Sequence, residues 1–540
     1  MTHYYKGWQS PGRLGHQAGL AIFIITILLP LIYLLVETGV SPAEEWLPLL
    51  LPQGRSLGLL INSITMGLVV SLLGTGIAFF IAALCWRWQR GPLAYLKWLF
   101  LFMILVPAYI HSLAWGTAFN QLDAWFLGNN WPGISFNGWV AASLVQMMYL
   151  LPIAAGIILL GFQSLNPRLI EAARVLAPDQ EVWVRVILPV SYPILKVAAG
   201  ILFLLTIIDY SIPSLFQVST YAMEIFAEFS ASNDPNRVMA LSMPLLVITV
   251  PIMIYTGSGL RSMLLQPQKF TLDPKNMPEW PPQWKELKIV ALFLLILQVG
   301  LPLLVILKYT GSIDSFVTAV CGSRREIGLS LLVAFLTAIL ALPPALSAAK
   351  QLLKKSPSSA AWWIFTTLPL ALPAPLAGIA LIALWNHTYT NAIYGSLMMP
   401  VLAGLLRFMP LAVLVLVVYI KMINPMYLEA GDVFQKSELH GFLRIFLPFI
   451  SPGLLAAGGL VFALTAGELG ATLLVAPAGK ATLTMKIYNY LHYGATDTVA
   501  GLCAALMLIT FLMTMLIVGL NKYVIRSWNE QRGKNDAQNY

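Results

Sequence analysis

The stretch NPRLIEAARVLAPDQEVWVRVILP, at residues 166–189, has a second copy in the chain, NPMYLEAGDVFQKSELHGFLRIFLP, at residues 424–448. Each copy starts with Asn-Pro, places Glu-Ala five residues after the Asn and closes on Leu-Pro. Each is polar and charged, although the chain around it is mostly apolar. A polar helix that occurs twice between apolar stretches indicates a docking surface for a partner in the aqueous phase.

The composition indicates an integral membrane protein. Of the 540 residues, 58% are hydrophobic and 10% are charged, whereas soluble domains carry about 25% charged residues. The formal net charge is +9, but the basic residues are dispersed and form no stripe of the kind that binds nucleic acid. The three cysteines are far apart and form no CxxC pair, so neither a disulfide framework nor a zinc site is expected.

Apolar runs of membrane-spanning length occur throughout the chain. A helix needs about 20 apolar residues to cross a bilayer, and we predict an all-α polytopic membrane protein with twelve spans, six in each half. The first run lacks a small-residue cleavage site, so we expect a retained helix rather than a signal peptide. The predicted spans are 17–36, 57–84, 95–117, 138–162, 189–208, 238–260, 287–308, 327–349, 361–385, 396–420, 448–467 and 498–520.

The distribution of Lys and Arg predicts the orientation of these spans. With the N-terminus inside, 23 basic residues fall in cytoplasmic segments and seven in external ones, the asymmetry that the positive-inside rule describes. We therefore expect both termini, both polar copies and the proline-rich linker 261–288 on the cytoplasmic side.

The two halves of the chain match at a nearly constant offset. Pro152 precedes Glu171 by 19 residues, and Pro410 precedes Glu429 by 19. Six spans in each half keep the copies in the same orientation, which predicts a parallel repeat about an axis along the membrane normal. The predicted parts are a first half at 1–260, the linker at 261–288 and a second half at 289–540.

Each polar copy has the signals of a short helix. Asn166 and Asn424 are suitable N-caps, and the proline after each suits the first helical position. Small residues follow the glutamate in both copies, so a partner can approach the backbone closely. The alternative is an amphipathic connector at the membrane surface, which a second copy at a matched position makes less favoured.

These residues resemble the Glu-Ala-Ala coupling loop of type I ABC importer permeases. The family pattern continues with a Gly four residues after the second Ala and ends on Ile-x-Leu-Pro. Here Ala177 and Gln435 occupy the Gly position, and Pro178 can break the first copy at the same place. The residues that the resemblance assigns to ATPase coupling are Glu171, Ala172, Ala173, Ala177 and Pro178 in the first copy, and Glu429, Ala430, Gly431, Asp432 and Gln435 in the second.

The resemblance covers essentially the whole chain and implies the fused, two-half form of that fold. Loops 164–188 and 422–447 would each dock on one copy of a cytoplasmic ATPase, and a periplasmic or surface-anchored binding protein would deliver the substrate. The implied location is the bacterial cytoplasmic membrane. No GxxxxGK[ST] motif occurs in the chain. We therefore expect no catalytic residue and no bound cofactor here, with ATP and Mg used by the partner.

Charged residues within spans are candidates for the translocation pathway. Asp209 and Glu468 each lie 20 residues after a Leu-Pro proline, which is about 30 Å of helix and places both near the external face. Each is equally well explained as the cap of a short following helix. Arg407 and its counterpart Tyr149 are further pathway candidates, although a structural role is favoured for Arg407, either paired with an acidic residue of the second half or extended to the membrane interface.

The substrate is suggested by a second resemblance, to the fused ferric-iron permeases. Thiamine and phosphorylated small molecules are the alternatives, because permeases for them share the architecture. An ion-gradient-driven secondary transporter is the alternative class. No metal ligand is assigned to this chain, since in the family the iron ligands belong to the binding protein. The residues that carry this resemblance are Glu468 to Thr472, Pro477, Thr482, Leu483, Ile487, Tyr488, Tyr493 and Gly494.

Overall fold

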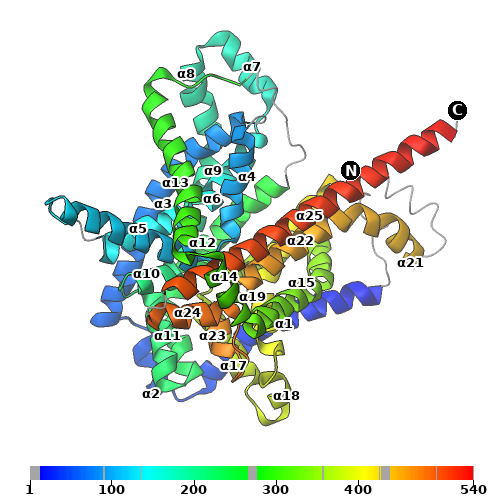
Figure 1. Ribbon diagram of the computed structural model, residues 1–540. Helices are drawn as coiled ribbons and strands as arrows, with labels where there is room; N and C mark the ends of the chain where they lie inside the picture. Colours follow the sequence, from blue (N-terminus) through cyan, green and yellow to red (C-terminus); the bar gives the residue numbers. More distant parts are fainter. Residues whose placement is uncertain are drawn as a thin grey trace.

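The computed structural model describes residues 13–88, 92–133, 136–265, 277–354, 358–424, 426, 438–493 and 496–538. Every regular element within these ranges is a helix (Figure 1). Among these described residues, ten helices are long and apolar enough to cross a membrane, and two bent helix pairs raise the number to twelve if each pair counts as one span. The predicted all-α polytopic membrane fold is confirmed.

Each of the twelve predicted spans coincides with one of these helices or bent pairs. The first six are α1 (Arg13–Val40), α3 (Arg55–Arg87), α4 (Pro92–Phe102) with α5 (Ala108–Gly128), α6 (Gly138–Gln163), α9 (Leu188–Ile207) and α12 (Pro235–Leu264). The last six are α13 (Lys285–Thr310), α15 (Arg324–Leu353), α16 (Ser358–Thr367) with α17 (Ala374–Trp385), α19 (Met398–Met422), α22 (Leu447–Ala466) and α25 (Thr496–Gln538).

The third span of each half differs from its prediction as one continuous helix. The α4–α5 pair is bent by 110° and the α16–α17 pair by 106°. In both, a 3₁₀ turn (Met103–Leu105 or Leu368–Ala371) precedes an extended residue and a proline, Val106-Pro107 or Leu372-Pro373. The proline ring disfavours the helical region for the residue before it, and in these two spans that residue is extended and the helix breaks.

The packing of the spans follows the same order in the two halves. Helix α3 packs against α6 and α9, and α15 packs in the same way against α19 and α22. A hydrogen bond is also repeated: Ser63 Oγ accepts from the Tyr221 N–H at 2.9 Å, and Ser330 Oγ accepts from the Leu483 N–H at 2.8 Å. Each bond joins the second span of a half to a short helix near the last span.

The first span of each half packs against the other half. Helix α1 contacts α15 and α17, and α13 contacts α3 and α5. The α1–α15 contact is close, because a Cβ on Gly19 would clash with Ser347 Oγ. The halves are therefore interlocked rather than merely adjacent.

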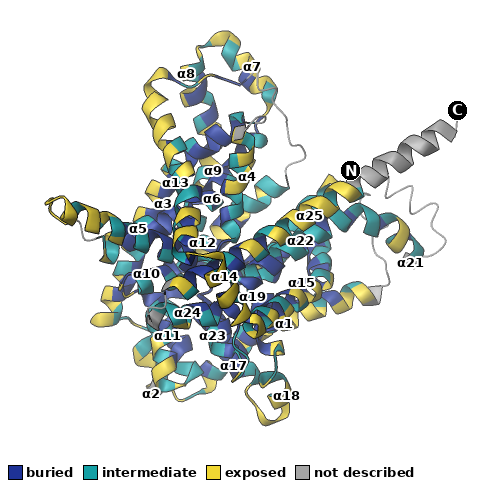
Figure 2. Cartoon of the chain, viewed as in Figure 1, coloured by how far each residue is buried: buried dark blue, intermediate teal, exposed yellow. Residues whose placement is uncertain are grey.

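Many large apolar side chains remain exposed on the outer faces of the spans (Figure 2). On α1, α3 and α13 they include Ile22, Ile25, Leu72, Leu73 and Leu304. Exposed apolar area of this extent is a liability in water but is what hydrocarbon chains require.

Short helices connect the spans. They are α2 (Ala43–Trp46), α7 (Pro167–Leu176), α8 (Asp179–Val182), α10 (Ser211–Leu215), α11 (Tyr221–Ser232), α14 (Ile313–Cys321), α18 (Asn391–Tyr394), α21 (Glu438–Gly441), α23 (Thr472–Val475) and α24 (Leu483–Tyr493). Further 3₁₀ turns span Leu47–Leu49, Pro282–Trp284 and Thr388–Thr390, and π turns span Trp183–Ile187 and Phe442–Phe446. Helices α7 and α8 lie at the opposite end of the molecule from α2 and α18 (Figure 1).

Candidate functional site

The first polar copy folds as its sequence signals predict. The Asn166 side chain accepts a hydrogen bond from the Arg168 N–H at 3.0 Å, and Pro167 is the first helical residue of α7. The helix ends at Leu176, because Ala177 and Pro178 are extended before α8 begins. The turn expected at this position therefore forms although Ala stands where the family pattern has Gly.

Helix α7 offers an accessible surface. Ile170 is buried and anchors the helix, whereas Glu171 and Ala172 are exposed. Val175 and Leu176 are each 86% exposed. Ala173 and Ala177 are half-buried, and Pro178 is exposed. Apolar side chains that project this far at a polar end of the molecule fit contact with a protein partner.

Both polar copies end in a π turn, which the sequence analysis did not predict. The Leu188 N–H bonds to the Trp183 carbonyl, and the Leu447 N–H bonds to the Phe442 carbonyl, each five residues back. The next residue in each copy is a proline, which cannot donate to an α-helical ladder. Such π turns are rare and occur mostly as single widened turns within α-helices, often at functional sites. The shared Leu-Pro was the only sequence signal.

The second polar copy is described only at its two ends. The Asn424 side chain accepts from the Met426 N–H at 3.1 Å, which is the predicted N-cap. The coupling residues predicted in this copy lie outside the described residues, and description resumes at α21. They are Glu429, Ala430, Gly431, Asp432 and Gln435.

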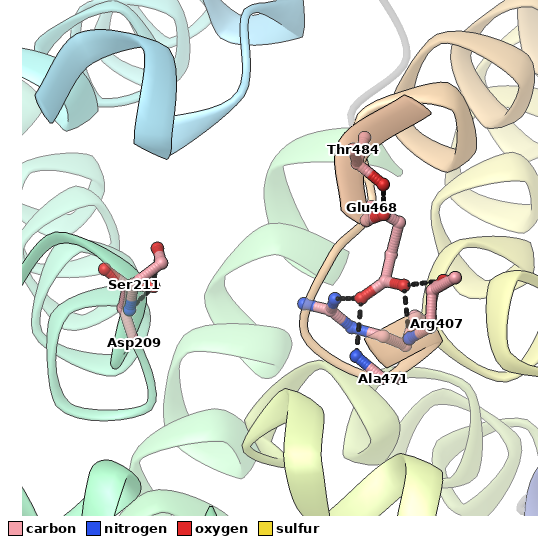
Figure 3. Close-up of polar contacts among 7 residues, drawn as sticks. Asp209, Ser211, Arg407, Glu468, Ala471 and Thr484 are labelled. Carbon is pink, nitrogen blue, oxygen red and sulfur yellow. Dashed lines mark hydrogen bonds and ion pairs between the residues drawn. The ribbon is translucent and has the colours of Figure 1, made fainter. Parts of the chain in front are cut away.

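The two acidic candidates both bond the backbone of a following short helix (Figure 3). Asp209 Oδ1 accepts from the Ser211 N–H at 3.1 Å and from its hydroxyl at 2.7 Å, and Asp209 Oδ2 accepts from the Ile212 N–H at 3.2 Å. Glu468 accepts from the Ala471 and Thr472 N–H groups, each at 2.8 Å, and from the Thr472 hydroxyl. The capping alternative raised from the sequence therefore describes both carboxylates.

Arg407 pairs with Glu468. The Arg407 Nη1 to Glu468 Oε1 distance is 2.5 Å; the Arg407 side chain is 27% exposed and that of Glu468 fully buried. Tyr149, the counterpart of Arg407, instead packs its ring against His111, with centroids 5.3 Å apart. Arg407 and Glu468 thus form one group in the second half, and the two turns lie on opposite sides of the view in Figure 3.

The turn that carries Glu468 contacts the breaks of both bent spans. A Cβ on Gly467 would lie 2.6 Å from Pro107 Cγ, and one on Gly470 would lie 2.5 Å from Ala374 Cβ. Tyr210 of the first half lies 3.4 Å from the same Gly470 position. This turn is therefore a meeting point of the two halves, and only glycine allows such close approach at both positions.

The first half also buries polar groups without normal hydrogen bonds. The Gln146 side chain faces Asp209, yet neither of its amide atoms makes a hydrogen bond of normal geometry within the described residues. Gly404 stands at the matching position of the second half, packed against Thr337 and Thr465. Among the described residues, no group of three His, Cys, Asp or Glu side chains is arranged to hold a metal ion.

Comparison with known proteins gives three informative relatives, while no family model matches the chain. The chain is 23% identical over 523 residues to the Fe(3+)-transport system permease protein FbpB 2 of Haemophilus influenzae, covering 90% of this chain and 94% of that protein. It is 25% identical over 263 residues to the putative 2-aminoethylphosphonate transport system permease protein PhnV of Salmonella choleraesuis, covering 46% of this chain and 99% of that protein.

A shorter similarity involves the sulfate transport system permease protein CysT of Salmonella typhimurium. It is 28% identical over 121 residues, covering 20% of this chain and 43% of that protein. All three relatives are transport-system permeases by name. One relative matches nearly end to end within less than half of this chain, whereas another matches almost the whole of it.

Proposed function

This chain is a permease subunit of an ABC importer, and from that premise we propose that it forms the translocation pathway for ferric iron delivered by a binding protein. The observation that carries the proposal is the pairing of whole-length similarity to an Fe(3+) permease with an exposed α7 docking segment. The chain itself performs no hydrolysis in this proposal. Its role is to convert movement of a partner ATPase into movement of the two halves.

The partners follow from the two docking segments and the missing nucleotide motif. Two ATPase copies would bind at loops 164–188 and 422–447, and they would use ATP and Mg while this chain holds no cofactor. The exposed Val175 and Leu176 side chains support contact at the first loop. Both loops lie on the cytoplasmic side in this proposal, as do both termini of this multi-pass inner-membrane protein.

The pathway is proposed to run between the halves at 1–260 and 289–540. Asp209, Glu468, Arg407 and Tyr149 lie near its external end. The Arg407–Glu468 pair and the caps on Asp209 support a role in shaping the two turns that border the pathway. Gly467 and Gly470 of the Glu468 turn pack against Pro107 and Ala374, so movement of the bent spans would reach this turn.

Ferric iron is preferred as the cargo because the relative with the widest coverage is an Fe(3+) permease. Other relatives are named for 2-aminoethylphosphonate and sulfate, which means that similar permeases carry different cargoes. The alternative cargo is thiamine or a phosphorylated small molecule. A secondary transporter is less favoured. Its ion-coupling carboxylates would have to titrate or bind ions, whereas Asp209 and Glu468 are both engaged by backbone N–H groups.

The test is ATPase co-purification with the full chain. Glu171→Ala combined with Glu429→Ala should lose the ATPase that co-purifies with the wild-type protein. Glu44→Ala is the matched control, because Glu44 is an exposed acid of α2, at the opposite end of the molecule from α7.

Uptake into vesicles then tests the transport class and the cargo. Labelled ferric iron should enter only with ATP and the binding protein present, and labelled thiamine should not. Iron uptake driven by an ion gradient without ATP would contradict the proposal.

A further inference from the structure

Glu279, in the linker between the halves, is bound to loop 164–188, called the first docking segment below. The Glu279 N–H donates to Asp179 Oδ2 at 2.6 Å, and Trp183 Nε1–H donates to the Glu279 carbonyl at 2.9 Å. The Arg87 guanidinium donates to the neighbouring Pro278 carbonyl at 2.5 Å. Three side chains from α3, α8 and the π turn thus hold two consecutive residues of the linker through its backbone.

The same contacts reach α7. Arg174 lies in the last turn of α7, and its guanidinium donates to Asp179 Oδ1 at 2.8 Å and to Oδ2 at 3.3 Å. Asp179 therefore joins α7 on one side and the linker on the other. A rotation of α7 cannot leave the linker in place unless these bonds break.

An aromatic cluster surrounds this contact. The Trp183 side chain has no exposed area, and its ring centroid lies 5.9 Å from that of Trp280 and 5.8 Å from that of Trp284. Phe79 and Trp86 of α3 lie 6.3 Å and 6.2 Å from it. Rings at these separations interlock and resist sliding, so the linker is fixed in position as well as hydrogen bonded.

The linker leads directly into a span of the second half. The 3₁₀ turn ends at Trp284, and α13 begins at Lys285. Helix α13 packs against α3 and α5 of the first half and against α25 of the second. The first docking segment is therefore connected, without an intervening free segment, to a helix that contacts both halves.

We propose that residues 277–284 act as a strap that transmits movement of the first docking segment to α13, with Trp183 as the positioning residue. This inference rests on the proposed function, because it takes α7 to be a site where the ATPase applies force. Through the strap, movement of the first docking segment would reach α13 directly. The same movement would also reach α9, the fifth span of the first half. Loss of the Trp183 bond should leave the ATPase bound but reduce the cargo moved per ATP.

The experiment compares two tryptophan substitutions in the full chain with its ATPase and binding protein. Trp183→Phe removes the indole bond to Glu279. Trp280→Phe makes the same indole-to-phenyl change in the same cluster, at a side chain whose buried Nε1 has no hydrogen-bond partner among the described residues. One hydrogen bond shifts an equilibrium about fivefold. We expect ATP consumed per cargo molecule to rise by up to about fivefold in Trp183→Phe and to stay near wild type in Trp280→Phe.

A second variant and a second measurement address folding. Asp179→Asn changes charge but not size at a partly exposed side chain, and it should raise the ATP-to-cargo ratio in the same direction. Spin labels at Val175→Cys on α7 and Ile289→Cys on α13, in a Cys321→Ser background, report the relative position of the two helices without the ATPase. Val175, Ile289 and Cys321 are exposed.

The label-to-label distance distribution should broaden in Trp183→Phe but not in Trp280→Phe. Equal ratios and equal distributions in the two tryptophan variants would overturn the strap. If the ATPase does not bind the wild-type chain at all, the proposed function fails instead, while the distance measurement still tests the strap by itself.

Discussion

The turns after the fifth span of each half use a carboxylate in the same way with side chains of different length. Helix α10 begins two residues after Asp209, whereas α23 begins four residues after Glu468. Asp209 reaches the N–H groups two and three residues ahead, and Glu468 those three and four residues ahead. The extra methylene of glutamate thus matches the longer turn. Both carboxylates act as caps of the turns that follow them.

The electrostatic surroundings of the two caps differ more than their bonds. Glu468 is fully buried and is neutralised by Arg407. Asp209 has hydroxyl and N–H donors, and the matching side chain in its half is the neutral Tyr149. The second half therefore has an ion pair at this position, whereas the first half has a carboxylate bonded by hydroxyl and N–H donors. Substitutions at the two positions should not lower the free energy of unfolding equally.

The largest effect is expected for Glu468→Gln. This change leaves Arg407 without its anion and turns an amide NH2 toward donor groups. Breaking a buried pair by removing one partner costs about 3–5 kcal/mol, and the partial exposure of Arg407 favours the lower end. Unfolding of the purified protein in detergent should show a loss of about 3 kcal/mol.

A double-mutant cycle separates the pair from the cap. Arg407→Ala should lower stability less than Glu468→Gln, because Glu468 keeps its N–H donors. The double variant should be less destabilised than the sum of the two single variants, since coupled partners are not additive. Additive losses would mean that the ion pair contributes nothing beyond the cap.

A smaller effect is expected for Asp209→Asn in the first half. Asparagine keeps one acceptor for Ser211 but presents an NH2 to the Ile212 N–H. Loss of a helix cap costs about 1 kcal/mol, so the same unfolding experiment should show a drop of about that size. A loss as large as that of Glu468→Gln would contradict the distinction between the two turns.

The features that could be predicted from the sequence are those that depend on residues close together in the chain. The caps at Asn166 and Asn424 and the helix end before Pro178 depend on neighbouring residues, and the structure bears them out. The positions of the spans follow from apolar length alone. Whether Asp209 and Glu468 would serve as caps stayed undecided, because hydropathy does not report how many residues separate a carboxylate from the next helix.

The features that could not be predicted are of two kinds. Some depend on contacts between residues far apart in the sequence, and others are local breaks that hydropathy averaged over a whole span conceals. The bends before Pro107 and Pro373 lie inside apolar runs, where composition over a whole span hides one extended residue. The binding of Trp183 to the linker joins residues 96 positions apart. A proline-rich linker is typical of an exposed connection, and nothing local in it indicates that its backbone is held by α3, α8 and the π turn.

The smallest effect on stability is expected for Gln146→Leu. The Gln146 amide is fully buried next to Asp209 without a normal hydrogen bond among the described residues. Replacing it with an apolar side chain of similar shape removes a desolvation penalty of about 1 kcal/mol, but it also removes the amide that faces the Asp209 carboxylate. The net change in the unfolding experiment should therefore stay below about 1 kcal/mol. Gln298→Leu on α13 is the matched control, because its amide is equally buried and unbonded within the described residues. If Gln146 serves the pathway beside Asp209, transport should fall in Gln146→Leu but not in Gln298→Leu. Equal transport in the two variants would assign Gln146 no part in the asymmetry of the two turns.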